Sequence, residues 1–549
     1  MRRALVSALF LCILFLSNCG RQDTGLVIKG RVLTEEGRPP LLAHVHLIKP
    51  GQTLRDPEKT LKLESDGSFE IIADSLHVFT LKITAVNHLP LSLPVYLDSM
   101  PREIKLKARL KHYDYLPGFD EVEITGNWTD SAESRIKTMI KQEDGRFICT
   151  VKPAKDTLTY ALMNITKNGR SVNGTMSDAY RYDGGGDYFS LIEAQSDSLT
   201  VVFDPALLKR SRHKTPEVRY SDNVAYLQEL LQMELMAEKE YENYREMAIS
   251  HRKSGKPREE FRYNAISFKE YLLNTARTAP KPLNLYARFK LAQAGGFLFS
   301  LDSMEYEDII NTLPNENPLW DTDPRSFVML YVKRYGYDKG IKKLEKNIPH
   351  IKSRILSGQV IGNIGVYYYY TGQKEKANKY YDLLTKQYSD IPAIQFYIKR
   401  INPDKKIDVG KPVPPFSIPL MDSDKTFSNK DLAGKYTLID FWAVWCGPCI
   451  GEMPKLHEAY KKFKGPRFTI LSLSFDGKED DVRKFRKERW PMPWLHAFVK
   501  GGFNSDLAKK FEVMGIPKPI LVDPDGTIVA KEADLRGSQL EETLKKYLK

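Results

Sequence analysis

A run of apolar residues that ends in two closely spaced cysteines constrains the fold of this chain more than any other feature. Residues 435–445 (KYTLIDFWAVW) form a continuous apolar segment, typical of a strand buried on both faces. Cys446 and Cys449 follow at once, and apolar residues then recur at the spacing of an amphipathic helix. We therefore expect the cysteine pair at a strand-to-helix junction, with Cys446 at the helix N-terminus.

The segments that follow predict a layered α/β domain. Residues 468–476 (FTILSLSFD) indicate a second buried strand, and residues 518–531 (KPILVDPDGTIVAK) indicate a hairpin around an Asp-Gly pair. A helical pattern closes the chain, and Ser538 and Glu541 offer it a capping box. Alternating strands and helices are typical of an α/β layer fold.

The 549 residues are too many for one hydrophobic core and indicate a multidomain chain. Short alternating strands between turn signals favour a β-sandwich over residues 20–110, similar to the carboxypeptidase-regulatory type of exported domain. Residues 111–212 resemble the early-set, immunoglobulin-like sandwich of glycogen-binding modules. Trp128 there is either a stacking platform for a sugar or a side chain that packs at the core edge, and the packing interpretation is favoured.

The middle of the chain has a helical pattern. Residues 213–402 carry apolar side chains at three- and four-residue spacing, which predicts an α-helical region. Its end, residues 361–384, resembles one tetratricopeptide-type helical hairpin, although a single such unit cannot bury its own face. Prolines between residues 403 and 419 then forbid a continuous helix and mark a linker or edge hairpin. The last domain is expected over residues 403–549.

The net charge of +13 raises the question of nucleic-acid binding. The Lys and Arg residues are scattered among Asp and Glu, and the chain has no recognition-helix motif and no RNA-binding motif. We therefore expect a basic, solvated surface and no nucleic-acid partner.

Residues 1–19 predict an export signal. Arg2 and Arg3 precede an apolar stretch that is short for a bilayer span. The segment ends in Leu-Ser-Asn-Cys, which resembles a bacterial lipoprotein signal and implies lipidation of Cys19. The alternative is ordinary secretion with Cys19 lost or free. No later apolar stretch of about 18 residues occurs, so an anchored and not a spanning protein is expected.

Five cysteines are too few for a disulfide-built scaffold. Cys12 and Cys19 belong to the export signal, and Cys149 lies in an alternating strand pattern that indicates a buried, inert thiol. Structural zinc usually needs four ligands, and no second cysteine pair or His cluster accompanies Cys446 and Cys449. A structural disulfide across so short a loop would stabilise little. Redox chemistry is therefore the favoured interpretation, and no metal is expected.

A helix N-terminus suits Cys446 to nucleophilic attack. Only the thiolate attacks a disulfide, and the partial positive charge of a helix start favours that anion. A pKa of about 7 is expected for the thiol of such a motif. Gly447 allows the loop to turn, and Pro448 preorganises the first helical turn. Cys449, one turn in, is expected to be the less exposed thiol and to resolve a mixed disulfide.

Residues 445–449 (WCGPC) are the active-site sequence of the thioredoxins. Within residues 408–549, the stretches VGKPVPPFSI, GKYTLIDFWA, IGEMP and VDPDGTI resemble the TlpA/ResA branch of exported thiol–disulfide oxidoreductases. This resemblance implies a C-terminal thioredoxin fold in which Trp445 completes the motif. A lipoprotein with β-sandwich and helical domains ahead of such a domain is similar to Bacteroidota TlpA-family proteins.

The resemblance also implies roles for residues outside the motif. Asp440, on the strand beneath the site, would be buried with a raised pKa and could relay a proton to or from Cys449. The basic partner that thioredoxins place on the next strand is not evident in residues 468–476. Glu452 either matches the active-site glutamate of the ResA branch or is an exposed helix carboxylate.

Two further positions match the family. Pro517 corresponds to the cis-proline that faces the cysteine pair, and it would align the Ile516 backbone to bind a client chain in strand fashion. Pro454 should kink the active-site helix.

The expected function is that of a lipid-anchored, periplasm-facing thiol–disulfide oxidoreductase of the cell envelope that reduces client disulfides. The Gly-Pro dipeptide favours a reductant, because thioredoxin lies near about −270 mV and strong oxidants near about −120 mV. The family implies a membrane thiol transporter of the DsbD/CcdA type as electron donor and no organic cofactor. The alternatives are a disulfide oxidase or isomerase with the same residues, and a glycan- or protein-binding surface lipoprotein with an accessory redox domain.

Overall fold

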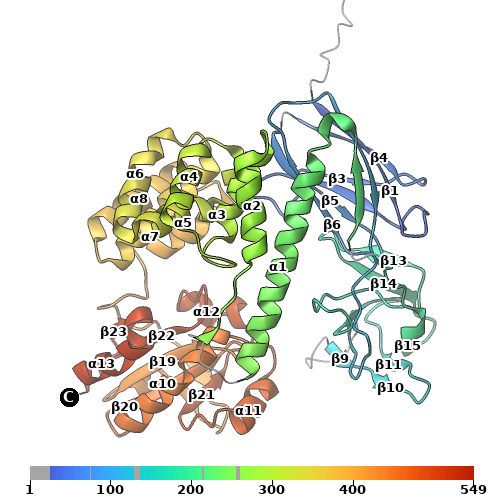
Figure 1. Ribbon diagram of the computed structural model, residues 1–549. Coiled ribbons are helices and arrows are strands. Elements are labelled where there is room, and N and C mark those ends of the chain that lie inside the picture. The colour runs from blue at the N-terminus through green and yellow to red at the C-terminus, as the bar shows by residue number, and fades with distance from the viewer. Residues whose placement is uncertain (1–24, 75, 129–135, 213–214, 255–259, 549) are drawn as a thin grey trace, which may run out of the picture. The chain divides into compact units, whose positions relative to one another are not determined.

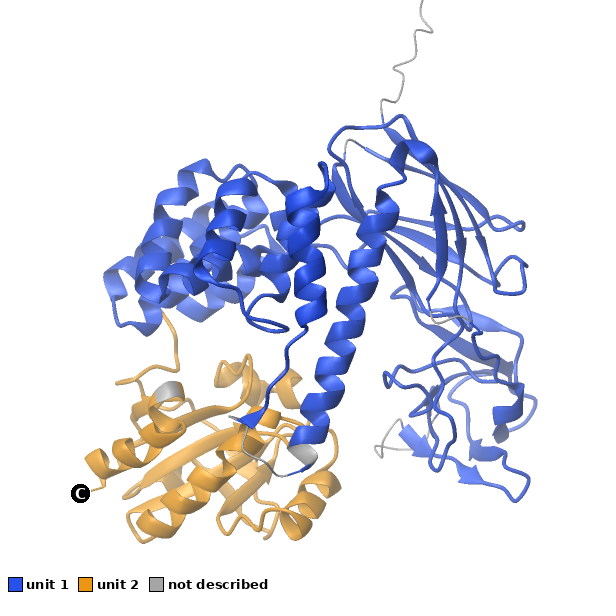
Figure 2. Cartoon of the chain, viewed as in Figure 1, with its two compact units in different colours: residues 1–401 blue, residues 402–549 orange. Residues whose placement is uncertain are grey.

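The computed structural model describes residues 25–548, apart from 75, 129–135, 213–214 and 255–259. The chain forms two compact units, residues 1–401 and 402–549 (Figure 2). The first unit contains two β-sandwiches followed by helices, and the second is an α/β fold (Figure 1). The expected multidomain class, with β-sandwich, helical and C-terminal α/β parts, is confirmed.

Two four-stranded sheets, of order β16-β7-β1-β4 and β3-β2-β5-β6, form the first sandwich. Its strands are β1 (Leu26–Leu33), β2 (His44–Ile48), β3 (Lys59–Lys62), β4 (Ser68–Ala73), β5 (Val78–Thr84), β6 (Leu91–Tyr96), β7 (Glu103–Arg109) and β16 (Glu217–Tyr220). Alternate residues of both sheets, such as Ile28 and Leu81, are fully buried in one shared core.

The helical region does not begin at residue 213 as expected, because residues 217–220 form β16. This strand pairs antiparallel with β7, with Glu217 opposite Arg109, and Val218 is buried in the core of the first sandwich. Four residues are too short a pattern to recognise beside the long helical segment that follows. The second sandwich is thus inserted between two adjacent strands of the first.

The second sandwich packs a sheet of order β10-β11-β15 against one of order β13-β14-β12-β8-β9. Its strands are β8 (Glu123–Gly126), β9 (Ile136–Thr138), β10 (Ile140–Lys141), β11 (Phe147–Val151), β12 (Thr157–Met163), β13 (Tyr180–Tyr182), β14 (Tyr188–Glu193) and β15 (Leu199–Phe203). Cys149 is a buried free thiol in this core, and burial raises its pKa. Trp128 packs against the same core, and a Cβ at Gly126 would lie 2.6 Å from its ring. These contacts agree with the packing interpretation of Trp128.

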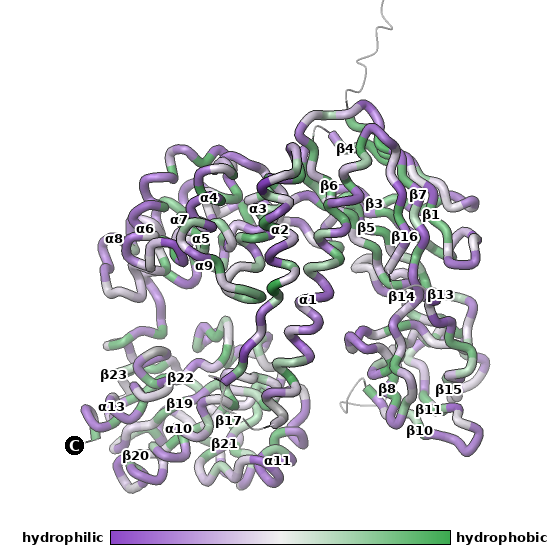
Figure 3. Tube along the Cα trace, in the orientation of Figure 1, coloured by the Kyte–Doolittle hydropathy of each residue, from purple (hydrophilic) through white to green (hydrophobic). Residues whose placement is uncertain are grey.

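Paired helices complete the first unit. They are α1 (Leu227–Lys253), α2 (Ile266–Thr278), α3 (Leu283–Ala294), α4 (Ser303–Thr312), α5 (Pro324–Tyr335), α6 (Tyr337–Asn347), α7 (Arg354–Tyr370), α8 (Lys374–Gln387) and α9 (Gln395–Ile401). Hydrophilic residues are spread along α1 (Figure 3). Within the described residues, no helix combines the length and apolar character that a bilayer crossing requires.

The second unit is built on a mixed sheet of order β21-β20-β19-β22-β23. Its strands are β19 (Tyr436–Trp442), β20 (Phe468–Ser474), β21 (Leu495–Phe498), β22 (Lys518–Val522) and β23 (Ile528–Lys531), with β17 (Ser417–Pro419) and β18 (Thr426–Ser428) as a separate hairpin. Its helices are α10 (Gly447–Phe463), α11 (Glu479–Glu488), α12 (Asp506–Lys510) and α13 (Ser538–Tyr547). β19 runs parallel to β20 and antiparallel to β22.

The two faces of β19 contact different cores. Leu438 and Trp442 pack with residues of α10, α11 and α13, whereas Ile439 and Phe441 pack on the other face with the β17–β18 hairpin and α12. Because side chains alternate along a strand, Asp440 lies on the same face as Leu438 and Trp442. The strand therefore places this carboxyl on the side of the sheet that α10 covers.

Candidate active site

The two cysteines lie at the start of α10, as the sequence predicts. They form a disulfide with their Cα atoms 5.2 Å apart. Cys446 is the N-cap residue, and its Sγ accepts a hydrogen bond from the backbone N–H of Cys449 at 3.2 Å. No acidic residue occupies the first turn of α10, so nothing there offsets the positive end of the helix dipole. This geometry favours a thiolate on Cys446 in the reduced form.

Both cysteines of the disulfide are largely covered by protein. Cys446 is 4% exposed and Cys449 is 2% exposed, which agrees with the expectation that Cys449 is the more shielded thiol. Trp445 next to the pair is 59% exposed, and its ring centroid lies 6.4 Å from that of Phe503. Of the two cysteines, Cys446 is thus slightly the more exposed, and it follows directly on the exposed side chain of Trp445.

The proline predicted to face the pair has the expected isomer. The peptide bond between Ile516 and Pro517 is cis, and Ile516 packs against the cluster that contains both cysteines. Pro448 lies in the first turn of α10, and Pro454 lies inside the same helix.

Asp440 is buried beneath this helix. It is 3% exposed and lies opposite Ser472 of β20 and Pro519 of β22, neither of which carries a charge. Burial raises the pKa of Asp440 to about 7; the negative charge of Glu452 adds to this rise, and the positive charge of Arg536 opposes it. Asp440 can therefore gain or lose a proton near neutral pH.

Glu452 is not a solvent-exposed helix carboxylate. Its Oε1 lies 3.1 Å from Nε of Arg536, and its Oε2 accepts a hydrogen bond from the backbone N–H of Gly537 at 2.8 Å. Its side chain is 21% exposed. These contacts join α10 to the segment that leads into α13.

The capping box expected at Ser538 and Glu541 is absent. α13 has Gly537 as its N-cap, without a side-chain hydrogen bond, and Glu541 instead pairs with Lys462 and Lys545. The capping box was expected from neighbouring residues of the sequence alone, whereas the carboxylate of Glu541 forms an ion pair with Lys462 of α10.

Two residues of the site were missed from the sequence. Asp476 accepts hydrogen bonds from the backbone N–H of Val444 at 3.0 and 3.2 Å and from the hydroxyl of Ser474 at 2.8 Å, which fixes the loop before the cysteines. Its place just after β20 was a usable signal, because the carboxyl ends of parallel strands meet at one edge of a sheet. Arg536 had no such signal, since it lies 84 residues after Glu452.

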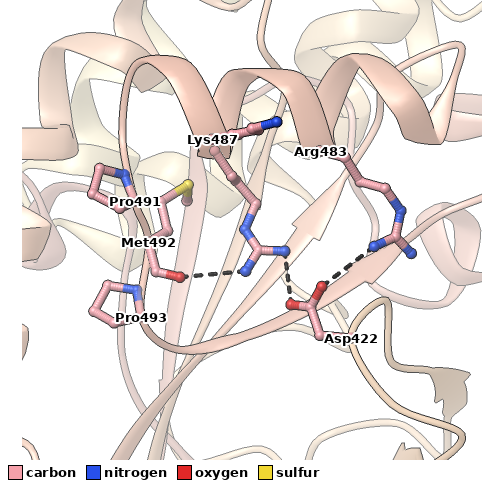
Figure 4. A pocket seen from close by; sticks show the side chains of 7 residues that line it. Asp422, Arg483, Lys487, Pro491, Met492 and Pro493 are labelled. Carbon is pink, nitrogen blue, oxygen red and sulfur yellow. Dashed lines mark hydrogen bonds and ion pairs between the residues drawn. The ribbon is translucent and has the colours of Figure 1, made fainter.

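Two cavities of the second unit are lined by residues other than the cysteines. One, of about 370 Å³, is lined by Asp422, Arg483, Arg486, Lys487, Pro491, Met492 and Pro493 (Figure 4). Asp422 there forms ion pairs with Arg483 at 3.4 Å and with Arg486 at 2.7 Å. Two of the cations that line this cavity are therefore already paired with a carboxylate of the protein. Within the described ranges, no group of three or more His, Cys, Asp and Glu side chains could hold a metal ion.

Comparison with known proteins identifies the family. Residues 434–528 match the family model described as Thioredoxin-like. The thiol–disulfide oxidoreductase ResA of Bacillus thuringiensis subsp. konkukian is 32% identical over 146 residues, which are 27% of this chain and 80% of that protein. The chain belongs to the ResA-type thiol–disulfide oxidoreductases of the thioredoxin family.

Other similar proteins include ResA of Oceanobacillus iheyensis, 29% identical over 184 residues that span 32% of this chain and 91% of that protein. The crystal structure of the thioredoxin domain of a thiol–disulfide oxidoreductase from Bacteroides vulgatus is 34% identical, covers 26% of this chain and 99% of that one, and has a TM-score of 0.24. The residues of this ResA-type oxidoreductase that match the family model, 434–528, include the cysteine pair.

The buried carboxyl of this ResA-type oxidoreductase predicts a pH-dependent stability change. Because folding raises the pKa of Asp440 from 3.8 to about 7, the native state loses stability as pH rises through this range. Asp440→Asn should therefore raise the free energy of unfolding by roughly 4 kcal/mol above pH 7 and by little at pH 4. Hydrogen exchange of β19 peptides at both pH values measures the difference, and an equal effect at the two would contradict the prediction.

Proposed function

We propose that this protein is a lipid-anchored, periplasm-facing thiol–disulfide oxidoreductase that reduces disulfides in client proteins. The observation that carries the proposal is the N-cap position of Cys446, whose sulfur accepts the N–H of Cys449, the residue to which it is disulfide-bonded. This arrangement stabilises the attacking sulfur as an anion and keeps the second sulfur within reach.

The reaction starts from the reduced dithiol. The Cys446 thiolate attacks one sulfur of a client disulfide, forms a mixed disulfide and releases the first client thiolate. The thiolate of Cys449 then attacks Cys446, closes the intramolecular disulfide and releases the second client thiolate. Two electrons pass to the client. Asp440, which can exchange a proton near neutral pH, is suited to accept the proton of Cys449.

Residues around the pair are suited to bind a client chain. Trp445, which precedes Cys446, is 59% exposed, and Phe503, whose ring centroid lies 6.4 Å from that of Trp445, is 40% exposed. The Ile516 backbone next to the cis peptide bond offers hydrogen-bonding groups for an extended segment of the client. Gly447 and Pro448 form the start of α10 and so set the position of its N-terminus. The redox-active disulfide itself serves as the reagent, without an organic cofactor.

The proposed location rests on the export-signal pattern at the start of the sequence, and the proposed electron donor rests on the resemblance to the TlpA/ResA branch. Residues 1–19, including the proposed lipidation site Cys19, lie outside the described residues. A reductant outside the cytosol needs a continuing electron supply, and a membrane thiol transporter of the DsbD/CcdA type is the proposed donor.

Trapping of clients tests this function. Cys449→Ser leaves Cys446 able to attack but removes the thiol that resolves the mixed disulfide, so covalent adducts with client proteins should accumulate and disappear on treatment with dithiothreitol. Cys446→Ser combined with Cys449→Ser is the matched control and should trap nothing. If the single variant forms no adducts in an oxidising periplasm, the client model is wrong.

The redox potential separates reduction from the oxidase and isomerase alternatives. Equilibration of the full chain with defined glutathione mixtures gives this value, and a potential well above about −200 mV would remove the reductase interpretation.

A further inference from the structure

The segment that leads into α13 binds the carboxylate of Glu452. Two consecutive residues bind its carboxylate, one through the guanidinium Nε of Arg536 at 3.1 Å and the other through the backbone N–H of Gly537 at 2.8 Å. Gly537 has a φ of 55°, a positive value that residues other than glycine rarely adopt. Glu452 is thus held at both carboxylate oxygens by two consecutive residues of the segment that leads into α13.

Glu452 and Arg536 are also the charged groups that act on Asp440. On the neighbouring strands, Asp440 lies opposite Ser472 and Pro519. The nearest cation along β22 is Lys518, whose Nζ donates to the backbone carbonyl of Glu512. Burial apart, the groups that shift the pKa of Asp440 are Glu452 of α10, which raises it, and Arg536, which lowers it.

We propose that Arg536 is a positioning residue for the transfer of a proton between Cys449 and Asp440. Its guanidinium supplies the positive charge that β20 lacks, and it holds the carboxylate of Glu452 in one place. The inference rests on the proposed exchange of a proton between Asp440 and Cys449. To that exchange it adds the positive charge of Arg536, a residue distant in the sequence from both Asp440 and Cys449.

The opposite signs of the two charges make the role testable. Without Arg536, the field of Glu452 is unopposed while Gly537 still binds that carboxylate, so Asp440 becomes harder to ionise. Without the charge of Glu452, Asp440 becomes easier to ionise. Since only ionised Asp440 can accept a proton from Cys449, the pH range of the second thiol's reaction should move up in the first case and down in the second.

Stopped-flow reaction of the reduced full-length protein with dithionitrobenzoate separates the two thiols. Attack by Cys446 releases the first thionitrobenzoate, and attack by Cys449 on the resulting mixed disulfide releases the second. Arg536→Gln should move the inflection of the second phase upward by roughly half to one pH unit, and Glu452→Gln should move it downward. Arg536→Lys should stay within about 0.3 unit of the wild type, and Asp440→Asn should lose the inflection.

The outcomes distinguish this inference from the proposed function. Absence of the first phase in the wild type would sink the dithiol chemistry itself. The role of Arg536 would be wrong, and the dithiol chemistry would stand, if Arg536→Gln showed a normal first phase and an unchanged pH profile of the second phase. A shift of that profile in the same direction as in Glu452→Gln would have the same meaning. Should Arg536→Gln fail to fold, the double variant Arg536→Gln/Glu452→Gln leaves no carboxylate without its partner. Its profile should lie above that of Glu452→Gln alone, and equal profiles would overturn the role of Arg536.

Discussion

Replacement of Cys446 by serine is expected to abolish disulfide reduction, with a rate at least about 10³-fold below that of the wild type. A serine hydroxyl at the N-cap still accepts the N–H of residue 449, so the start of α10 is retained. It is not a nucleophile toward sulfur at neutral pH, however, and Cys449 is only 2% exposed. The rate of reduction of a protein disulfide by the full-length chain, measured with an excess of reductant, tests this.

Cys149→Ala is the matched control for this experiment. Cys149 is a buried free thiol in the second sandwich, outside the unit that holds the disulfide, so its removal should leave the rate within about twofold. Activity retained in Cys446→Ser would show that another sulfur starts the reaction, contrary to the N-cap argument.

The largest expected loss of stability comes from replacing a buried arginine of the helical region. Arg288 is 7% exposed and donates to both carboxylate oxygens of Asp308, at 2.8 and 3.2 Å, and to the backbone carbonyls of Ala276 and Asn284. Arg288→Met removes the donor to the buried carbonyl of Ala276 and the ion pair with Asp308, whose side chain is 50% exposed and can be hydrated in part. The free energy of unfolding should fall by roughly 2 kcal/mol.

An exposed pair of the same chemistry provides the control. Arg354 donates to both carboxylate oxygens of Asp390, at 3.0 and 2.9 Å, but the two side chains are 60% and 63% exposed. Water replaces these bonds when they are lost, so Arg354→Met should cost less than about 1 kcal/mol. Urea unfolding followed by circular dichroism compares the two variants, and equal losses would mean that burial does not determine the effect.

The parts of the fold that the sequence predicted are those set by local patterns. The apolar run before the cysteines became β19, because its side chains are buried on both faces. The Asp-Gly turn joins β22 and β23, with Gly526 at a φ of 83°. The position of Cys446 at a helix start followed from the same kind of pattern.

The parts that could not be predicted depend on contacts between distant segments. Arg536 reaches Glu452 across 84 positions, and no periodicity links them. Strand β16 pairs with β7 more than 100 residues away, and Glu541 prefers Lys462 of another helix over a local cap. In each case the contact depends on how distant segments pack in three dimensions, which cannot be read from local patterns in a single sequence.

The nesting of one sandwich inside the other has a consequence for how the protein is made. During synthesis, β1 and β7 emerge early, but the edge strand that pairs with β7 follows only after residues 111–212. The first sandwich therefore stays incomplete until the whole insert has left the ribosome. Since Arg109 and Glu217 are paired neighbours, the insert begins and ends at one place, and a short turn between these residues could replace it without a change of strand register.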